Sequence, residues 1–484
     1  MLLSTLLTPF FSLPTDMDRD ISRLILDSRQ IQPNDAFIAI KGTQSDGRAY
    51  IDKAITQGAI AILVDAEVPN ESLSWRENIP LIPIQHLQNK LGELAARFYH
   101  HPANHLYMIG VTGTNGKTSC THFIAQILQR LHTPCGIIGT LGSGFYGALG
   151  TVGLTTPDAI TLQALLADFQ AQHAKAIAME VSSHSIDQGR VNGIPFELGI
   201  FTNLTQDHLD YHGDMETYAN VKKRFLAEFP TKQLILNAED PYGKRWLKEL
   251  TQQKSVIAYS TQSSADVYTD HVKLSLQGIT AQVHTPWGEG ALSLPLIGQF
   301  NLSNALAVLT ALCLYGIPLP DVLQQLAHLE PVPGRMQTYG GHGKPLVVVD
   351  YSHTPDALER ALQALRAHTQ GKLICVFGCG GNRDTSKRPV MAKIAEKLAD
   401  QVIVTNDNPR HEDPEEIAKH ILQGFLHPER VTVLLDRSKA IQNSIQCASA
   451  SDCILIAGKG AERYQQIGDE KIPFDDREQV RAYL

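Results

Sequence analysis

The sequence predicts an α/β protein with three domains, and three observations indicate this class. Short apolar runs typical of buried strands alternate with helical patterns along most of the chain, which favours mainly parallel sheets. Between about 256 and 297 the pattern changes to alternating residues. The segment EPVPGRM at 330–336 is typical of a linker, and a fresh series of strands follows it. We therefore expect regions 1–86, 87–331 and 332–484.

Composition is that of an ordinary soluble globular protein. The 484 residues are enough for roughly two to four domains. Hydrophobic residues make up 43% and charged residues 19% of the chain, which is typical of this class. The net charge of −8 and a pI near 6.2 argue against nucleic acid as the main partner. The seven cysteines are scattered without a CxxC pair, so neither a zinc site nor a disulfide framework is expected.

The N-terminal stretch MLLSTLLTPFFSLP is apolar but does not have the features of a signal peptide. No Lys or Arg precedes it, and no small-residue cleavage site follows. No run in the sequence approaches the roughly 18 apolar residues that a membrane-spanning helix needs. We expect this stretch to pack as part of the first domain, in a cytoplasmic, monomeric protein without membrane contact.

Each region has its own succession of elements. The first, expected to be a small α/β domain, contains LILDSRQIQPNDAFIAIKG, the helical YIDKAITQG, the strand AIAILVD and a helix around LGELAARFY that leads into the second region. The second has the strands CGIIGT, AKAIAMEV, LGIFTN and KQLILN, then VKLSLQGITAQVH and ALSLPLIG around PWGEG, which predict an antiparallel flap. The third has PLVVVD, LICVFG, QVIVT, VTVLL and CILIAG.

The strongest local signal is GVTGTNGKTS at 110–119, between a predicted strand and a predicted helix. A P-loop reads GxxxxGK[ST]: backbone N–H groups surround the phosphates, the lysine contacts the β- and γ-phosphates, and the hydroxyl binds Mg²⁺. Gly116, Lys117 and Thr118 fit the end of this pattern, whereas Val111 stands where its first glycine is expected. The alternative, a glycine-rich turn that binds nothing, is disfavoured by the strand before, the helix after and GKT between them.

Two further strands of this region end in residues that could hold a metal ion. AIAMEV ends at Glu180, and LGIFTN runs into LTQDHLDYHG with His208. The carboxyl ends of parallel strands meet at one sheet edge, so both should lie beside the glycine loop. Mg²⁺ prefers oxygen ligands, and Glu180 is expected to bind it directly or through water. By pattern alone, His208 is an ordinary loop histidine, while Lys222 and Lys223 belong to a solvated helix face.

The stretch TNDNPRHEDP at 405–414 follows the strand QVIVT abruptly. Ligands in α/β proteins gather at the carboxyl ends of strands. The second half is explained as a helix entry, with Asp413 as N-cap and Pro414 at the first position. DNPR, residues 407–410, is left without a structural explanation, which favours a role in binding.

Other nucleotide-binding classes fit less well. DPYG at 240–243 matches the DxxG pattern of GTP-dependent switches, but NKxD is absent, since the Asn-Lys pair continues as NKLG at 89–92. GCGGNRD at 378–384 does not complete GxGxxG, because Arg383 stands at the third glycine. A GTP switch and an oxidoreductase are therefore both disfavoured.

Motifs spread along nearly the whole chain resemble those of the Mur ligase family. In order they are GTNGKTS, EVSSH, NLTQDHLDYHG, GQFNLSNALA, PGRMQ and DYSHTPDAL. DSR near the N-terminus, with GCGGNRD, DNPR and GKGAE near the C-terminus, resembles the members that add meso-diaminopimelate. The resemblance implies a first domain for the UDP end of a peptidoglycan precursor, a central P-loop ATPase with a mainly parallel sheet, and a C-terminal Rossmann-like domain for the incoming amino acid.

The resemblance also implies site residues. ATP would be held by Gly113, Thr114, Asn115, Gly116, Lys117, Thr118, Ser119, Asn304, Arg335 and Asp350. The UDP-precursor would contact Leu26, Ser28, Thr43, Gln44, Ser45, Thr155, Thr156, Ser182, Gln188 and Arg190. Diaminopimelate would contact Arg383, Asp407, Asn408, Pro409, Arg410, Gly458 and Glu462. The catalytic residues would be Lys117, Glu180, His208 and Lys222, and the metal ligands Thr118, Glu180, His208 and Lys222.

Two of these positions need comment. Lys222 matches the lysine that the family carries as a carbamate, which would turn a cation into an anion able to support a second Mg²⁺ with His208. Leu154 stands where the family has a polar Asn before the Thr pair, so a precursor contact is not expected there.

The implied reaction joins meso-diaminopimelate to the D-Glu γ-carboxylate of UDP-N-acetylmuramoyl-L-Ala-D-Glu. ATP would phosphorylate that carboxylate, and the amine would displace phosphate through a tetrahedral intermediate. Lys117 and Mg²⁺ would offset the repulsion between the anions. Diaminopimelate carries a distal carboxylate that lysine lacks, and the planar fork of Arg410 is matched to it. Asp407 and Asn408 would position Arg410 or take the distal ammonium.

Three other functions compete with this one. A lysine-adding member of the same family is disfavoured by DNPR. An enzyme like folylpolyglutamate synthase would share the loop and the γ-carboxylate chemistry but leave the DSR region without a purpose. A binding protein that uses ATP only as a conformational switch belongs to a different class, and phosphate release that requires both substrates would exclude it.

Overall fold

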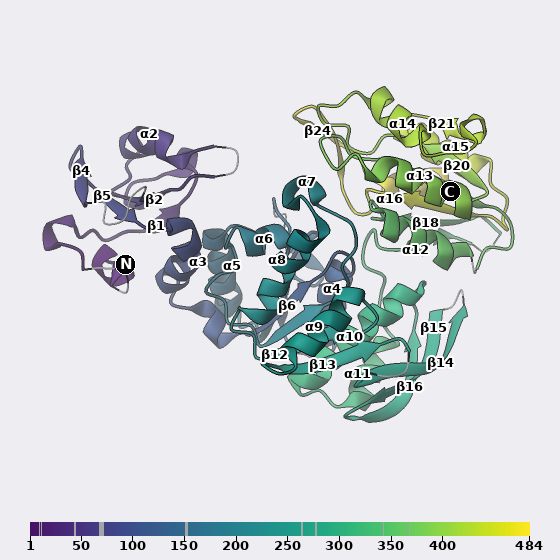
Figure 1. Cartoon of the computed structure of the whole chain (residues 1–484), viewed down its shortest axis with the longest axis horizontal. Coiled ribbons are helices and arrows are strands. Elements are labelled where there is room, and N and C mark those ends of the chain that lie inside the picture. The colour runs from purple at the N-terminus through teal and green to yellow at the C-terminus, as the bar shows by residue number, and fades with distance from the viewer. Residues whose placement is uncertain are drawn as a thin grey trace. The chain divides into compact units, whose positions relative to one another are not determined.

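The structure is a computed structural model that describes residues 1–8, 10, 12–42, 45–66, 72–150, 153–262, 265–275, 278–341, 343–366 and 368–484. Its elements are labelled in Figure 1. The chain forms two compact units. The first comprises Met1–Gly110, Thr133–Glu197 and Arg224–Lys232, and the second comprises Val111–His132, Leu198–Lys223 and Gln233–Leu484. No described helix is long and apolar enough to span a membrane.

The N-terminal part of the first unit is a five-stranded sheet in the order β1-β2-β3-β5-β4, with β4 antiparallel and the others parallel. Its strands are β1 (Arg23–Ile25), β2 (Asp35–Ala39), β3 (Ala61–Asp65), β4 (Ser74–Arg76) and β5 (Ile79–Ile84). Its helices are α1 (Leu3–Leu7), α2 (Ile51–Thr56) and α3 (Leu87–Phe98). Leu3, Leu6 and Leu7 are buried in the core of this part, so the prediction of a packed N-terminal segment is confirmed.

The rest of the first unit has strands in the order β6-β10-β7-β8-β9. They are β6 (Tyr107–Thr112), which ends in the second unit, β7 (Cys135–Gly139), β8 (Gly142–Phe145), β9 (Ala148–Gly150) and β10 (Ala176–Glu180). The helices are α5 (Ala159–Ala171) and α6 (Ser183–Asp187). β7 and β10 are parallel, as predicted, while β8 and β9 add an antiparallel hairpin.

The second unit begins with strands in the order β11-β12-β13-β14-β15-β16. They are β11 (Leu198–Phe201), β12 (Gln233–Asn237), β13 (Ser255–Ser260), β14 (Val267–Ser275), β15 (Gly278–Thr285) and β16 (Gly288–Leu294). The helices are α4 (Lys117–Arg130), α7 (Leu209–His212), α8 (Met215–Ala227), which ends in the first unit, α9 (Pro241–Leu250), α10 (Gln299–Tyr315) and α11 (Leu319–Leu326). Asp240 of DPYG caps α9, accepting from the amides of Tyr242 and Gly243.

The predicted antiparallel flap is shorter than expected. β13 pairs in parallel with β12, so residues 256–260 were wrongly included, and the antiparallel pairs join β14, β15 and β16. Alternation of polar and apolar residues indicates which face of a strand is exposed. The relative direction of two strands depends on the segment that connects them. α9 crosses over between β12 and β13, and such a crossover makes the two strands parallel.

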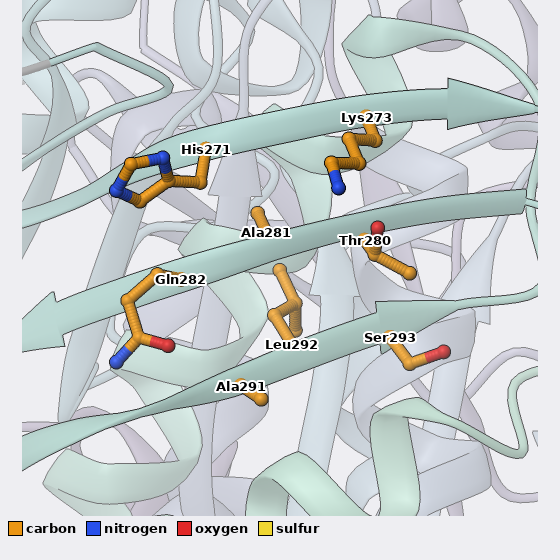
Figure 2. Close-up of a pocket in the computed structure, with 8 residues that line it drawn as sticks. All are labelled: His271, Lys273, Thr280, Ala281, Gln282, Ala291, Leu292 and Ser293. Carbon is orange, nitrogen blue, oxygen red and sulfur yellow. The ribbon is translucent and has the colours of Figure 1, made fainter.

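The three flap strands also carry an open pocket (Figure 2). It is lined by His271 and Lys273 of β14, by Thr280, Ala281 and Gln282 of β15, and by Ala291, Leu292 and Ser293 of β16. None of the predicted site residues is among them.

The C-terminal part of the second unit is a six-stranded sheet in the order β17-β18-β22-β19-β20-β21, antiparallel only at β17. The strands are β17 (Gln337–Gly340), β18 (Leu346–Asp350), β19 (Leu373–Phe377), β20 (Gln401–Val404), β21 (Thr432–Val433) and β22 (Cys453–Ala457). The helices are α12 (Pro355–Arg366), α13 (Lys387–Leu398), α14 (Pro414–Leu422), α15 (Arg437–Gln446) and α16 (Asp476–Tyr483). The hairpin of β23 (Tyr464–Ile467) and β24 (Glu470–Pro473) is separate.

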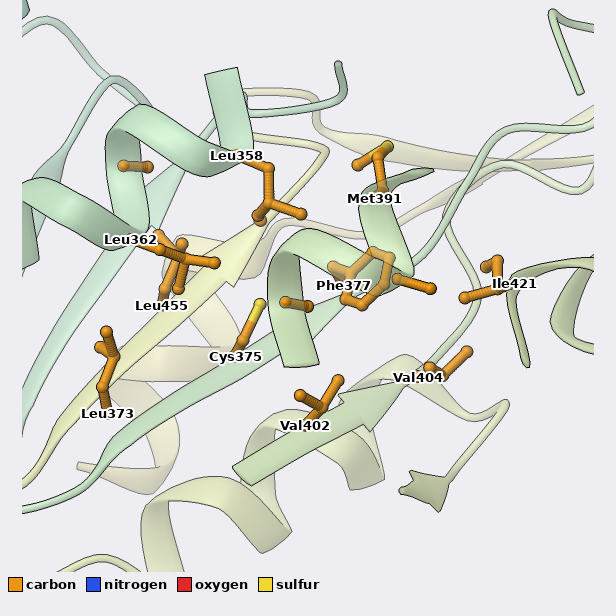
Figure 3. Close-up of a cluster of buried hydrophobic side chains, with 14 of the residues drawn as sticks. Leu358, Leu362, Leu373, Cys375, Phe377, Met391, Val402, Val404, Ile421 and Leu455 are labelled. Carbon is orange, nitrogen blue, oxygen red and sulfur yellow. The ribbon is translucent and has the colours of Figure 1, made fainter. Parts of the chain in front are cut away.

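Both faces of this sheet are buried. Figure 3 shows one core, where Cys375, Phe377, Val402 and Val404 of the strands meet residues from α12, α13 and α14, such as Leu358 and Met391. The intervening strand residues, such as Ile374 and Ile403, pack against α15 and α16. Helices on both faces of a mainly parallel sheet make a doubly wound domain, whose strand ends are the usual place for a ligand.

Candidate functional site

The glycine loop of residues 113–116 joins β6 to α4 in a conformation that suits phosphate binding. Gly113 and Gly116 have φ values of 145° and 90°, which side chains disfavour. A Cβ at Gly113 would collide with Thr202 Oγ1, and one at Gly116 with Asn304 Oδ1. α4 begins directly after the loop at Lys117, and the N-terminus of a helix that follows a glycine loop is a common site for an anion.

Neighbouring residues hold the loop in this shape. The amides of Thr114 and Asn115 donate to the backbone carbonyl and side-chain oxygen of Asn203, at 2.8 and 2.9 Å. Thr202 Oγ1 donates to the Asn115 carbonyl at 2.6 Å. Lys117 Nζ donates to the carbonyls of Gly113 and Thr114 at 2.8 and 2.9 Å. A lysine folded over its own loop lies where a phosphate could replace these carbonyls as its partner.

The predicted ATP contacts outside the loop gather at α4. Arg335 Nη2 donates to Thr118 Oγ1 at 3.2 Å, and its guanidinium lies 4.1 Å from the centroid of the Tyr351 ring. Asp350 accepts from the amide of Met336, next to Arg335, at 2.6 Å. The structure therefore brings Thr118, Arg335 and Asp350 into one neighbourhood, and Asn304 adjoins Gly116.

Lys222 is buried rather than solvated, so the interpretation from pattern alone was wrong. Its side chain is 1% exposed, its Nζ donates to the Gly113 carbonyl at 2.9 Å, and it lies 4.8 Å from the centroid of the Tyr218 ring. Burial, and then the charge of Lys117, lower the pKa of Lys222 well below its usual value, against an opposing effect of Asp207. A neutral lysine amine is the form that adds to carbon dioxide, so this environment suits a carbamate.

Asp207 lies between two histidines and was not among the predicted residues. His208 Nε2 lies 3.4 Å and His353 Nε2 3.8 Å from Asp207 Oδ2. Burial alone would raise the pKa of Asp207, but the charges of His208, His353, Lys387 and Lys117 lower it to about 2. The carboxylate is thus ionised at neutral pH beside the predicted ligand His208. Its place directly before His208 was the signal that could have identified it.

In the first unit, five predicted precursor contacts gather around Glu180. Thr156 Oγ1 donates to the Glu180 carbonyl at 2.7 Å, and Arg190 Nη1 donates to the Thr156 carbonyl at 3.0 Å. Thr155 Oγ1 lies 3.2 Å from Thr140 Oγ1, whose hydroxyl and amide donate to the Glu180 carboxylate at 3.2 and 2.8 Å. The amide of Ser182 donates to Thr156 Oγ1 at 3.3 Å, and Gln188 Oε1 accepts from Arg190 Nε at 2.9 Å.

The remaining precursor contacts are less informative. Ser28 is buried at the start of a 3-10 turn (Ser28–Gln30), and Leu26 is partly buried just before it. Ser45 is exposed, and its carbonyl accepts from the Gly42 amide at 2.9 Å. The predicted contacts Thr43 and Gln44 lie outside the described residues. Leu154, which departs from the family pattern, has an exposed side chain.

Residues predicted to contact the amino acid lie just after the ends of β19, β20 and β22. Lys459 Nζ donates to Asn408 Oδ1 at 2.9 Å and to Glu462 Oε2 at 3.0 Å, while Asn408 Nδ2 donates to the same Glu462 oxygen at 2.8 Å. Asp407 Oδ2 lies against Gly458, where a Cβ would meet it at 2.5 Å. Lys459 is fully buried, and sequence reasoning missed it although it stands inside GKGAE.

Arg410 is held mainly by backbone groups. Its φ is 52°, its amide donates to the Gln466 carbonyl at 3.0 Å, and its carbonyl accepts from the Gly468 amide at 2.7 Å. Nη1 donates to the Gly381 carbonyl at 2.8 Å, so Asp407 and Asn408 do not position it by hydrogen bonds. Burial, and then the charge of Arg383, lower the pKa of Arg410. No ion pair with a described carboxylate is formed by the guanidinium of Arg410 or of Arg383, and Gly380 adjoins Arg410 Nη1 and the Cγ of Arg383.

Metal ligation is not visible as a ready-made cluster. Within the described residues, no group of three or more His, Cys, Asp or Glu side chains is arranged to hold a metal ion. The predicted magnesium ligands include only two side chains of these kinds, Glu180 and His208. The other two would be a hydroxyl and a carbamate.

Three family models match successive parts of the chain. They are the Mur ligase family catalytic domain at residues 20–99, the Mur ligase middle domain at 111–312 and the Mur ligase glutamate ligase domain at 334–460. The matched ranges follow the three predicted regions in order.

Relatives and solved structures agree with these models. The UDP-N-acetylmuramoyl-L-alanyl-D-glutamate–2,6-diaminopimelate ligase of Coxiella burnetii is 49% identical, with 96% of each chain covered. The enzyme of the same name from Pseudomonas aeruginosa is 48% identical, covering 97% of this chain and 96% of its own. A solved structure of that name has 36% identity and a TM-score of 0.69, covering 96% of this chain and 94% of its own.

More distant structures share the fold. A folylpolyglutamate synthase from Mycobacterium tuberculosis complexed with ADP has 19% identity and a TM-score of 0.65, covering 76% of this chain and 91% of its own. At this identity the likeness concerns the fold alone. The three matched models and the closely similar relatives together show that the chain belongs to the Mur ligase family.

Proposed function

We propose that the protein is the ATP-dependent ligase that joins meso-diaminopimelate to the D-Glu γ-carboxylate of UDP-N-acetylmuramoyl-L-Ala-D-Glu in peptidoglycan precursor synthesis. The observation that carries the choice of amino acid is the pocket around Arg410. Arg410 Nη1 and the side chain of Arg383 both adjoin Gly380, the charge of Arg383 acts on Arg410, and neither arginine forms an ion pair with a carboxylate of the described residues. The names of relatives 48–49% identical support the same substrates.

The reaction needs an activated carboxylate, because an amine cannot displace an oxide ion. Transfer of the γ-phosphoryl group of ATP to the carboxylate oxygen makes that oxygen part of a leaving group. The amine then attacks the carbonyl carbon, the tetrahedral intermediate collapses, and phosphate departs as the amide bond forms. The chain must therefore bring several anions together, and its cations and N–H groups have that task.

Residues of the loop and of α4 would bind ATP. The N–H groups at the start of α4 would donate to a phosphate, as helix N-termini commonly do, and Lys117 would exchange its two carbonyl partners for phosphate oxygens. Asn304 and Arg335 would complete the nucleotide contacts, together with Asp350. Solved structures with the same fold, such as the MurF ligase from Thermotoga maritima, contain ADP.

Mg²⁺ would be held by Thr118, His208 and a carbamate on Lys222, with Glu180 as a further ligand predicted from the sequence. The donors fit a hard cation in part: a carbamate and Glu180 would supply anionic oxygens, and the Asp207 carboxylate lies 3.4 Å from His208 Nε2. When bound, the ion would offset negative charge on the transferring phosphoryl group.

The pocket would distinguish the two ends of diaminopimelate by charge. Arg410 would bind the distal carboxylate through two parallel N–H···O bonds. Asp407 and Glu462 would attract the distal ammonium: the Asp407 carboxylate adjoins Gly458, and the Glu462 carboxylate accepts from Asn408 Nδ2. The precursor would lie against Thr155, Thr156, Ser182, Gln188 and Arg190, with its UDP end at Leu26, Ser28, Thr43, Gln44 and Ser45.

Phosphate release across a panel of amino acids tests the proposal. The purified protein receives ATP, Mg²⁺, the UDP-precursor and one amino acid at a time, with omission of each component as controls. We expect release that requires both the precursor and meso-diaminopimelate, and none from Lys117→Ala. Preference for lysine would identify a lysine-adding enzyme, and release without either acceptor would indicate an ATP-driven switch.

For the chain as a whole, we propose domain boundaries after residues 86 and 331, a cytoplasmic location and a monomeric state. The sheet strands at 23–84, 107–294 and 337–457 fall within the three predicted domains. A monomer would sediment as a single species of the chain's mass, 53.2 kDa.

A further inference from the structure

A buried ion pair lies next to the segments that carry the predicted amino-acid contacts. Arg437, the first residue of α15, and Asp476, the first residue of α16, both have fully buried side chains. Arg437 Nε and Nη2 donate to the two oxygens of Asp476, each at 2.7 Å. This bidentate geometry fixes the plane of the guanidinium.

The same guanidinium contacts two backbone carbonyls at the edge of the pocket. Nη1 donates to the Asn406 carbonyl at 3.1 Å, and Nη2 donates to the Ala457 carbonyl at 3.0 Å. Asn406 directly precedes Asp407, and Ala457 directly precedes Gly458. Both carbonyls therefore belong to residues that lead into predicted contacts with the amino acid.

These two segments come from strands that are not neighbours. β20 and β22 both pair with β19, one on each side of it. Sheet hydrogen bonds thus set each strand against β19 but do not join the segments that follow β20 and β22, which are linked through the side chain of Asn408 to Lys459 and Glu462. Arg437 contacts both ends, at a place where Gly458 and the Asp407 carboxylate are so close that a Cβ would not fit between them.

We propose that Arg437, oriented by Asp476, is a positioning residue for the amino-acid site. It fixes the segment that begins at Asp407 relative to the segment that begins at Gly458, and so sets the spacing of the groups that recognise the distal end of the amino acid. The inference rests on the proposed function for the identity of that amino acid. Arg437 would act through the backbone rather than by contact with a substrate.

Substitution by lysine separates positioning from charge. Arg437→Lys keeps a cation beside Asp476, but a single ammonium cannot reproduce the planar fork that reaches the carboxylate and both carbonyls. Arg477→Lys is the matched control. Arg477 lies on the same helix α16 and forms a bidentate pair with Asp475, and its side-chain hydrogen bonds do not reach the pocket segments.

The test is steady-state kinetics of phosphate release with each substrate varied in turn, for wild type, Arg437→Lys, Asp476→Asn and Arg477→Lys. We expect Arg437→Lys to raise the KM for diaminopimelate by about tenfold or more, because a shift on the order of 1 Å can cost on the order of 100-fold. Asp476→Asn should act in the same direction but more weakly. The KM values for ATP and the UDP-precursor should stay within about twofold in every variant.

A merely structural role would give a different pattern. If Arg437→Lys lowered the melting temperature and changed all three KM values alike, or changed none of them, the positioning role would be overturned. The same holds if Arg477→Lys produced the same selective effect. If wild type used another amino acid from the panel, the proposed function would be wrong, and the KM for that amino acid would then decide on Arg437.

Discussion

Lys222 shows how burial decides the chemistry of a single residue. Its amine lies beside Gly113 and Lys117 with a pKa well below the usual value. We expect it to be carbamylated in enzyme supplied with bicarbonate, as seen by carbon-13 NMR with labelled bicarbonate. Lys222→Ala should lose most activity and regain part of it with small carboxylic acids such as formate, which restore the anion.

The matched control for this substitution is the next residue. Lys223 is partly exposed and forms an ion pair with Glu249. Exposed pairs contribute about 0–1 kcal/mol, so Lys223→Ala should keep nearly full activity. A bare ammonium at Lys222 in active enzyme, or an unimpaired Lys222→Ala, would contradict the carbamate.

Arg410 is expected to set the choice between diaminopimelate and lysine. With lysine bound, the half-buried guanidinium would lose its carboxylate partner. Sites built around such a partner reject the analogue that lacks it by up to about 10⁴-fold. Because water can enter a partly exposed pocket, we expect discrimination of roughly 10²–10⁴ in kcat/KM. Arg410→Ala should bring the two substrates closer together, measured as kcat/KM for each amino acid.

The backbone does not confound this comparison. Arg410 has a φ of 52°, and alanine carries the same Cβ, so the conformational cost is unchanged. Arg430→Ala, at an exposed position, serves as the control. If Arg410→Ala lowers kcat/KM by the same factor for both amino acids, Arg410 serves catalysis or folding rather than specificity.

At the residue scale, site residues that stand in motifs could be predicted from the sequence. Residues that reach a site only through tertiary packing could not. DNPR and GKGAE contain Arg410 and Glu462, and the structure brings them close enough for the charge of Glu462 to act on the pKa of Arg410. Arg437 stands outside every motif, and only the fold shows that its guanidinium reaches Asn406 and Ala457. The burial of Lys222 was likewise inaccessible to a pattern that places it on a helix face.

At the scale of elements, the loop between β6 and α4 depends on the absence of side chains at its glycines. Gly113→Ala would combine a φ of 145° with a collision against Thr202 Oγ1. We expect ATP binding to weaken by at least about tenfold, because the loop must shift away from the start of α4. Isothermal titration calorimetry with ATP measures this.

Gly150→Ala is the control for this prediction. Gly150 has no positive φ, and a Cβ there would make only an ordinary contact with the Ser143 carbonyl. The affinity of Gly150→Ala for ATP should match that of the wild type. Equal affinity in Gly113→Ala as well would show that the loop is not the phosphate site.

Element type was predictable because apolar runs and caps are local properties. Asp413 does cap α14, accepting from the Glu415 amide, as the sequence predicted. The direction of β13 was not predictable in this way, because its parallel pairing with β12 depends on the crossover through α9. β17 was missed because four partly exposed residues at the edge of a sheet have no apolar run to mark them.

At the scale of the whole molecule, the two compact units do not coincide with the three predicted domains, because each unit is made of several separate stretches of the chain. The glycine loop, the residues around Lys222 and the predicted amino-acid contacts belong to the second unit, whereas Glu180 and the predicted precursor contacts belong to the first. A sequence pattern cannot predict such a division, because it depends on which strands and helices pack together. The order of the three family models does follow the predicted domains.

The central claim is that ATP activates the γ-carboxylate before the amide forms. It is tested with a UDP-precursor carrying oxygen-18 in the D-Glu γ-carboxylate, incubated with ATP, Mg²⁺ and meso-diaminopimelate. The account predicts that one oxygen-18 atom appears in each phosphate released and that the product has the mass of precursor plus diaminopimelate minus one water. Phosphate free of oxygen-18, with no new product, would show that water attacks ATP and would contradict the ligase.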